Sequence, residues 1–234
     1  MRRFGNAMIL SIHIPKTAGT SFGKSLKTKF GERLMFDYGD WAGYDSPEVL
    51  LHRAERTEQM RARKDELLET FDVIHGHFLA DKYLGLFPQA DFVAFFRDPC
   101  QQTLSNYYFM QNNPHLPHPA VKILHETKMT ILEFLSWDAV QNPQAKFLGS
   151  VPVESLAMVG LTEEFTRSID LFRSTFGHDV PAHFVSNVNP ERPGLEYKMD
   201  VELRKAMDKF RAADLDIYRR AQEVFAKQTA LRSA

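Results

Sequence analysis

ILSIHIPKTAGTSF, at residues 9–22, is the stretch that decides the fold of this chain. It opens with apolar and β-branched residues, which predict a buried strand. Pro15 and the small residues that follow predict a tight turn. Beyond the turn, apolar residues recur at helical spacing at Phe22, Leu26 and Phe30. A helix is therefore predicted to begin near Thr20 or Ser21.

A strand, a small-residue loop and a helix N-terminus in this order form a phosphate-binding arrangement. The first-turn N–H groups of a helix lack intrahelical partners, and the helix dipole places partial positive charge there. Lys16 adds a full positive charge, and Gly19 lets the backbone approach an anion without an intervening Cβ. Further hydrogen-bond donors are the hydroxyls of Thr17, Thr20 and Ser21. The loop is therefore predicted to cradle an anion.

The composition limits the classes of protein to which the chain can belong. Its 234 residues are enough for one large α/β domain, predicted here to span residues 1–234. Lys and Arg number 29 against 30 Asp and Glu, so no overall positive charge is available to bind nucleic acid. The single cysteine, Cys100, excludes an internal disulfide and favours a reducing cytoplasm. Because the N-terminal apolar run is too short to span a membrane, we expect a soluble, cytoplasmic protein of bacterial type.

Further apolar runs predict the remaining strands of a sheet. They lie at residues 71–75, 91–96 and 156–161, with a weaker one at 182–185. Residues 35–44, rich in aromatic residues and glycine, are interpreted as a loop. Helices are predicted at 46–70, from 99, at 131–140, at 144–148, from 162, and over a tail of about 199–230 broken near 213–214. The alternation predicts an α/β fold with an open, mostly parallel sheet covered by helices on both faces.

Ligands bind such sheets at the carboxyl ends of the strands, so polar residues there should converge. The loop of residues 15–21 is not the usual nucleoside triphosphate loop, which requires Gly-Lys-Ser/Thr after an earlier glycine. Ile-Pro-Lys-Thr-Ala-Gly-Thr-Ser-Phe instead resembles the 5′-phosphosulfate loop of the PAPS-dependent sulfotransferases, especially their carbohydrate branch and its bacterial relatives. (PAPS is 3′-phosphoadenosine 5′-phosphosulfate.) The resemblance implies a P-loop-like sulfotransferase fold, with PAPS bound at Pro15, Lys16, Thr17, Ala18, Gly19, Thr20 and Ser21.

A second segment, Phe-Phe-Arg-Asp-Pro at residues 95–99 and the helix after it, resembles the 3′-phosphate motif of the same family. There an Arg at a strand end and a Ser in the next helix hold the phosphate, and the match falls on Arg97 and Ser105. The alternative is an Arg paired with Asp98 and a Ser bonded within its own helix. Two weaker matches, Gln144 with Lys146 and a loop at 187–194 that carries Arg192, imply further cofactor contacts.

His75-Gly76-His77 follows the strand predicted at 71–75 and resembles the His-Gly-His of the uronyl 2-O-sulfotransferase branch. The resemblance gives His77 the role of general base, for which an imidazole is suited near neutral pH. His75 either supports His77 or is a buried structural residue. A metal site is not expected, because nearby cysteine or carboxylate ligands are lacking.

These matches imply transfer of a sulfuryl group from PAPS to an acceptor hydroxyl without a metal. Lys16 is also given a catalytic role, since its charge would stabilise the oxygen that leaves. A carbohydrate is one candidate acceptor, and lipid, small-molecule and peptide hydroxyls remain open, as does the oligomeric state. The alternatives are a P-loop kinase of a small molecule and a non-catalytic protein that binds a nucleotide or sulfated glycan.

Overall fold

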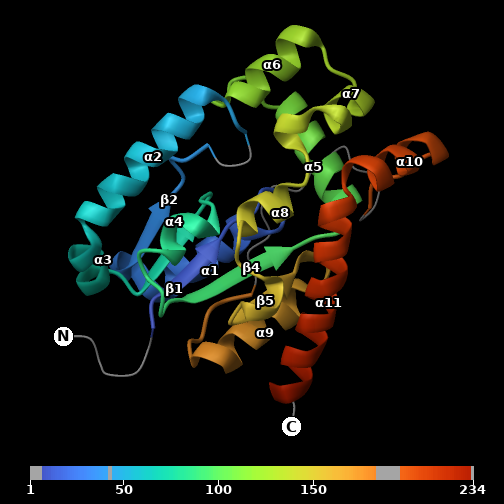
Figure 1. Ribbon diagram of the computed structural model, residues 1–234. Helices are drawn as coiled ribbons and strands as arrows, with labels where there is room; N and C mark the ends of the chain where they lie inside the picture. Colours follow the sequence, from blue (N-terminus) through green and yellow to red (C-terminus); the bar gives the residue numbers. More distant parts are fainter. Residues whose placement is uncertain (1–6, 42–43, 183–195, 233–234) are drawn as a thin grey trace.

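The computed structural model describes residues 7–41, 44–182 and 196–232, and within them the expected fold class is confirmed. Its sheet is open and five-stranded, with all neighbouring strands parallel and the order β2-β3-β1-β4-β5. The strands are β1 (Ile9–Ile12), β2 (Leu34–Asp37), β3 (Val73–Gly76), β4 (Asp91–Phe96) and β5 (Met158–Leu161). Helices flank the sheet, as Figure 1 shows.

The strand register brings the carboxyl ends of the three central strands together. Ile12 of β1 pairs with Gly76 of β3 and with Ala94 of β4. The backbone N–H of His13 donates to the carbonyl of Gly76 at 2.8 Å, which extends the pairing one residue further. The chain also crosses from one side of β1 to the other between β3 and β4. Such a switch point at the carboxyl ends is where open α/β sheets bind ligands.

Helices occupy the intervals between the strands and most of the C-terminal third. They are α1 (Gly19–Phe30), α2 (Pro47–Ala62), α3 (Lys64–Thr70), α4 (Ala80–Leu84), α5 (Pro99–Gln111), α6 (Pro119–Thr127), α7 (Ile131–Ser136), α8 (Pro143–Leu148), α9 (Phe165–Phe176), α10 (Val201–Phe210) and α11 (Ala212–Arg232). α9 and α11 both contact β5, while α2 and α3 lie toward the β2 edge (Figure 1). α5, α6, α7 and α10 gather beyond the end of the sheet toward which the β4 arrow points.

The prediction of a loop at residues 35–44 was wrong at its start, because residues 34–37 form the edge strand β2. Leu34 and Asp37 are buried there and pair with Val73 and Gly76 of β3. The strand reads Leu-Met-Phe-Asp, in which three apolar residues in a row replace the alternation of apolar and polar residues, so the period-2 signal of a strand is absent.

Other boundaries moved for local reasons. The helix predicted at 46–70 is broken at Arg63, whose φ of −103° and ψ of 14° are not helical. The predicted 131–140 helix ends at Ser136, and the break in the tail falls at Arg211. Helices α4 and α6 were not predicted. The weak strand proposed for 182–185 and the loop at 187–194 lie, apart from Ala182, outside the described residues.

Candidate active site

The loop after β1 has the conformation that its small residues permit. Lys16 and Ala18 both adopt the left-handed region, with φ of 66° and 67°. Thr17 between them is fully buried, and its Oγ1 donates to the carbonyl of Ile14 at 2.9 Å. Its hydroxyl therefore stabilises the loop from inside. α1 begins at Gly19 with Ala18 as its N-cap, and no side chain caps its first turn. The N–H groups of that turn are consequently suited to an anionic ligand.

Lys16 is half-buried at the entrance to this loop. Its Nζ lies 3.9 Å from the centre of the Phe109 ring, a cation–π contact with helix α5. Burial and, to a smaller extent, the nearby charge of Arg97 together lower the pKa of Lys16 to about 8. A cation with this pKa is poorly solvated, so an anion placed beside it is strongly favoured.

Arg97 follows β4 and lies against the same loop. Its Nη1 donates to the carbonyl of Lys16 at 3.2 Å, which joins residues 81 positions apart. Ser105, one and a half turns into α5, is buried with only 9% of its surface exposed. Its hydroxyl makes no hydrogen bond within the part of the chain that the structure describes. The structure thus brings Arg97 to the loop and leaves the Ser105 hydroxyl available.

Gln144 lies behind Arg97 rather than beside a ligand. Its side chain is fully buried on α8, and its Oε1 accepts from the backbone N–H of Arg97 at 3.1 Å. Its Nε2 donates to the Arg97 carbonyl at 2.9 Å. Asp214 on α11 in turn accepts from the backbone N–H groups of Gln144 and Ala145. In this arrangement Gln144 fixes the strand end that carries Arg97, and its predicted contact with a cofactor stays a prediction.

The ammonium of Lys146 binds backbone carbonyls of the segment before α8. Its Nζ donates to the carbonyls of Asp138 at 2.9 Å and Ala139 at 3.2 Å. Burial lowers its pKa. In this arrangement Lys146 supports the turn before α8. Arg192, the remaining predicted cofactor residue, lies outside the described residues.

Gln101 and Gln102, which were not predicted to have a role, bind backbone groups of other segments. Nε2 of Gln102 donates to the carbonyl of Pro15 at 2.8 Å, so α5 fixes the start of the phosphate loop. Nε2 of Gln101 donates to the carbonyl of Tyr197, and Oε1 of Gln101 accepts from the backbone N–H of Tyr197. Their position on the first turn of the helix after Arg97 was the signal available in the sequence.

The two predicted histidines differ in their surroundings. His75 is fully buried, and its Nδ1 is 2.8 Å from Oγ of Ser11. His77 is only half-buried, yet its Nε2 is buried and has no hydrogen-bond partner within the described part of the chain. Burial lowers the pKa of His75 to about 3 and that of His77 to about 4, so both are neutral at pH 7. A neutral imidazole can accept a proton.

A third histidine, His13, completes the group and was not predicted. Its ring lies 4.3 Å from that of His77 and 5.2 Å from that of His75. Its Nδ1 is 2.9 Å from the Oη of Tyr38. The signal for it was its place directly after β1, level with the carboxyl end of the strand.

Tyr38 reaches His13 from a segment held by buried charges. Asp37, at the end of β2, binds Nζ of Lys82 at 2.6 Å and Arg56 at 2.7 Å. Asp40 binds the same two cations. Burial acts to raise the pKa of Asp37, but the adjacent Lys82 and Arg56 hold it below its usual value. The backbone around Tyr38 is therefore fixed by ion pairs.

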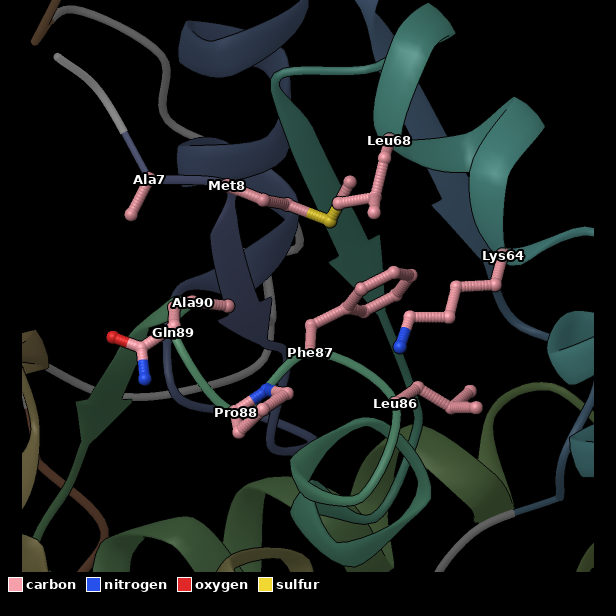
Figure 2. Close-up of a pocket in the computed structure, with 9 residues that line it drawn as sticks. All are labelled: Ala7, Met8, Lys64, Leu68, Leu86, Phe87, Pro88, Gln89 and Ala90. Atoms are coloured by element: carbon pink, nitrogen blue, oxygen red, sulfur yellow. The ribbon is translucent and has the colours of Figure 1, made fainter.

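A pocket of about 310 Å³ lies elsewhere in the molecule. Figure 2 shows its lining, in which Met8, Leu68 and Phe87 form apolar walls and Lys64 points inward. Met8 precedes β1, and Ala90 precedes β4, so this pocket is at the amino ends of the strands. It is separate from the site formed by Lys16, Arg97 and the histidines.

The described residues contain no group of three or more His, Cys, Asp or Glu side chains that could hold a metal ion. Among the helices in the same ranges, none combines the length and apolar character needed to cross a membrane.

No protein-family model matches the chain, and no curated protein matches its sequence. Among solved structures, a sulfotransferase from Alicyclobacillus acidocaldarius is similar over 95% of this chain and 96% of that chain, with 15% sequence identity and a TM-score of 0.49. The mouse sulfotransferase SULT7A1 complexed with PAP (3′-phosphoadenosine 5′-phosphate) is similar over 92% of this chain and 67% of that chain, with 13% identity and a TM-score of 0.40. Similarity at these levels assigns no activity to this chain.

Proposed function

We propose that this chain is a sulfotransferase that moves a sulfuryl group from PAPS to an acceptor hydroxyl. The observation that carries the proposal is the hydrogen bond from Nη1 of Arg97 to the carbonyl of Lys16. It joins the two segments that resemble the 5′-phosphosulfate and 3′-phosphate motifs. Two such motifs, far apart in sequence, would meet in this way if they bound opposite ends of one nucleotide.

The residues present suit a nucleotide with these two anionic groups. The uncapped first turn of α1 offers backbone donors, and Lys16 adds a cation at the same loop. Arg97 offers a planar set of donors matched to phosphate oxygens, and the Ser105 hydroxyl is available to join it. In this proposal the pair selects a 3′-phosphorylated nucleotide over ATP.

PAPS supplies the activated sulfuryl group, and the chain's residues position it and manage charge. His77 accepts the acceptor's hydroxyl proton as the new O–S bond forms. Lys16 and the first-turn N–H groups of α1 stabilise the negative charge that develops on the departing phosphate oxygen as the old bond breaks. His75, tied to Ser11, supports the strand end that carries His77. Carbohydrates are the first acceptors to screen, because the His-Gly-His segment resembles the uronyl 2-O branch.

The first test is a calorimetric titration with 3′-phosphoadenosine 5′-phosphate (PAP), compared with ADP and ATP in the absence of magnesium. The proposal requires a clear preference for PAP that is lost in Arg97→Ala. Binding of ATP as tight as that of PAP would overturn the assignment of Arg97 and Ser105. A magnesium requirement for binding would then favour a small-molecule kinase.

A second measurement separates an enzyme from a binding protein. Release of PAP from PAPS is followed in the presence of hydroxyl acceptors of several classes, with carbohydrates first. Turnover that depends on the acceptor supports the transferase. Tight PAP binding in which PAPS is released unchanged with every acceptor class would favour a non-catalytic nucleotide-binding protein.

A further inference from the structure

His13 lies among the residues of the site, but the sequence predicted no role for it. Its ring meets His77 edge to face, with centroids 4.3 Å apart. The other ring neighbours of His77 are more distant, with Tyr38 at 4.9 Å and Phe147 at 6.2 Å. Since the Nε2 of His77 has no hydrogen-bond partner within the described ranges, ring packing orients this imidazole.

The ring of His13 also supports the phosphate loop. A Cβ added at Gly19, the first residue of α1, would lie 1.9 Å from Cδ2 of His13. One turn later, a Cβ at Gly23 would lie 2.8 Å from Nε2 of His75. Glycine is therefore needed at both positions because an imidazole packs beneath each. The height of the first turn of α1 above the sheet is set by the His13 ring.

The orientation of the His13 ring is itself fixed. Its Nδ1 is hydrogen-bonded to Oη of Tyr38, whose backbone is held by the ion pairs around Asp37. The titratable groups that face His13 are Lys16, Tyr38, His75 and His77. The pKa of His77 itself is lowered first by burial and then by the nearby His118. Burial, then the neighbouring histidines and Lys16, lower the pKa of His13 well below its usual value. The ring is consequently a neutral spacer at pH 7.

We propose that His13 is the positioning residue of this site, whose ring packs against both the His77 imidazole and the first turn of α1. The inference rests on the proposed function, since it names the group that sets the distance between base and donor loop. Its physical consequence is that His13 keeps water from Nε2 of His77. Loss of the ring would hydrate that atom and raise the proton affinity of His77.

The test is an NMR titration of the His77 imidazole in the full chain. In His13→Ala we expect the pKa of His77 to rise from about 4 by at least one unit, a tenfold gain in proton affinity. His13→Phe keeps an aromatic ring in place, so we expect the low pKa to be retained. Gly19→Ala, whose new Cβ displaces the His13 ring, should raise the pKa of His77 as His13→Ala does.

Gly23→Ala is the matched control, because it adds the same methyl group one turn later, against His75. We expect it to leave the pKa of His77 within 0.3 units of wild type. An unchanged His77 pKa in folded His13→Ala or Gly19→Ala would overturn the proposal. If both fail to fold, a raised His77 pKa in His13→Phe would overturn it, and a retained low pKa there would support it.

This result is separable from the proposed function. The NMR titration is carried out without PAPS. If PAP failed to bind, the proposed function would be refuted, but the titration would still show whether His13 sets the pKa of His77. Conversely, if the chain preferred PAP to ATP but the His13 variants left the pKa of His77 unchanged, the proposed function would stand and His13 would have no positioning role. In an active enzyme, His13→Ala should lower turnover more than PAP affinity, whereas His13→Phe should restore most of the turnover.

Discussion

Nη1 of Arg97 donates to the backbone carbonyl of Lys16 at 3.2 Å, so the end of β4 and the loop after β1 are held together. Neither residue is near the other in sequence, and each follows a strand of the central sheet. Because both are cations, their proximity is unfavourable unless an anion lies between or beside them. The contact therefore defines where an anionic ligand would be most stabilised.

We expect Arg97→Ala and His77→Ala to have opposite kinetic effects. Arg97→Ala removes charge-assisted hydrogen bonds worth about 1.5–3 kcal/mol each, so PAP affinity should fall roughly 10- to 100-fold. His77→Ala removes a general base and should lower kcat by roughly 10²- to 10⁴-fold with little change in PAP affinity. Calorimetry and initial rates measure the two effects. Equal losses of affinity in both variants would refute these roles, and Arg33→Ala, a surface arginine paired with Asp72, serves as the control.

The affinity for PAP should fall as the pH rises through about 8. The free Lys16 ammonium loses its proton with a pKa of about 8, and only the charged form attracts the anion. The decrease should approach tenfold per pH unit until the higher pKa of the complex is reached. Lys16→Arg keeps its charge at all these pH values, so its affinity should not fall. Calorimetry between pH 6.5 and 9.5 measures both proteins, and a flat profile for wild type would contradict the prediction.

Lys82→Met should destabilise the fold by about 3–5 kcal/mol, because it leaves Asp37 and Asp40 buried with one cation fewer. Their side chains are bonded to Nζ of Lys82 at 2.6 and 2.7 Å. Urea unfolding measures the loss. Tyr83→Phe removes a single hydrogen bond to the Asp37 carboxylate and should cost less, about 1.5–3 kcal/mol. Similar losses in both variants would show that the buried ion pairs add little.

The free energy of unfolding should fall as the pH drops from 6.5 toward 4. His77 is buried neutral, its pKa lowered to about 4, so the unfolded chain binds its proton first. The contribution of His77 to the free energy of unfolding is fully present above its unfolded-state pKa of about 6.5. It is lost by about 1.4 kcal/mol per pH unit as the pH falls toward the folded-state pKa of about 4. Between pH 7 and 4.5, the free energy of unfolding of His77→Gln should fall by about 2–3 kcal/mol less than that of wild type. His115→Gln, at an exposed position, should behave as wild type in urea titrations at both pH values. An identical pH dependence in the two variants would contradict this assignment.

The sequence by itself determined the strand, loop and helix of residues 9–22 and the strand at 91–96. It also predicted a strand at 156–161, which forms over 158–161. These elements carry local signals, namely continuous apolar runs for buried strands and spaced apolar residues for α1. The same logic predicted that residues after parallel strands would meet at one edge, and Lys16 and Arg97 do so.

Tertiary structure alone decided which of the candidate residues face the site. Gln144 and Lys146 lie at the expected place on the chain, but one is bonded to the Arg97 backbone and the other to carbonyls of residues 138 and 139. Edge strand β2 had no clean alternation and is set by its pairing with β3. The sequence predicted no role for His13, because the rings that surround it belong to His77 and Tyr38, which are distant in sequence. Side-chain direction and long-range packing depend on the assembled sheet, which local periodicity does not encode.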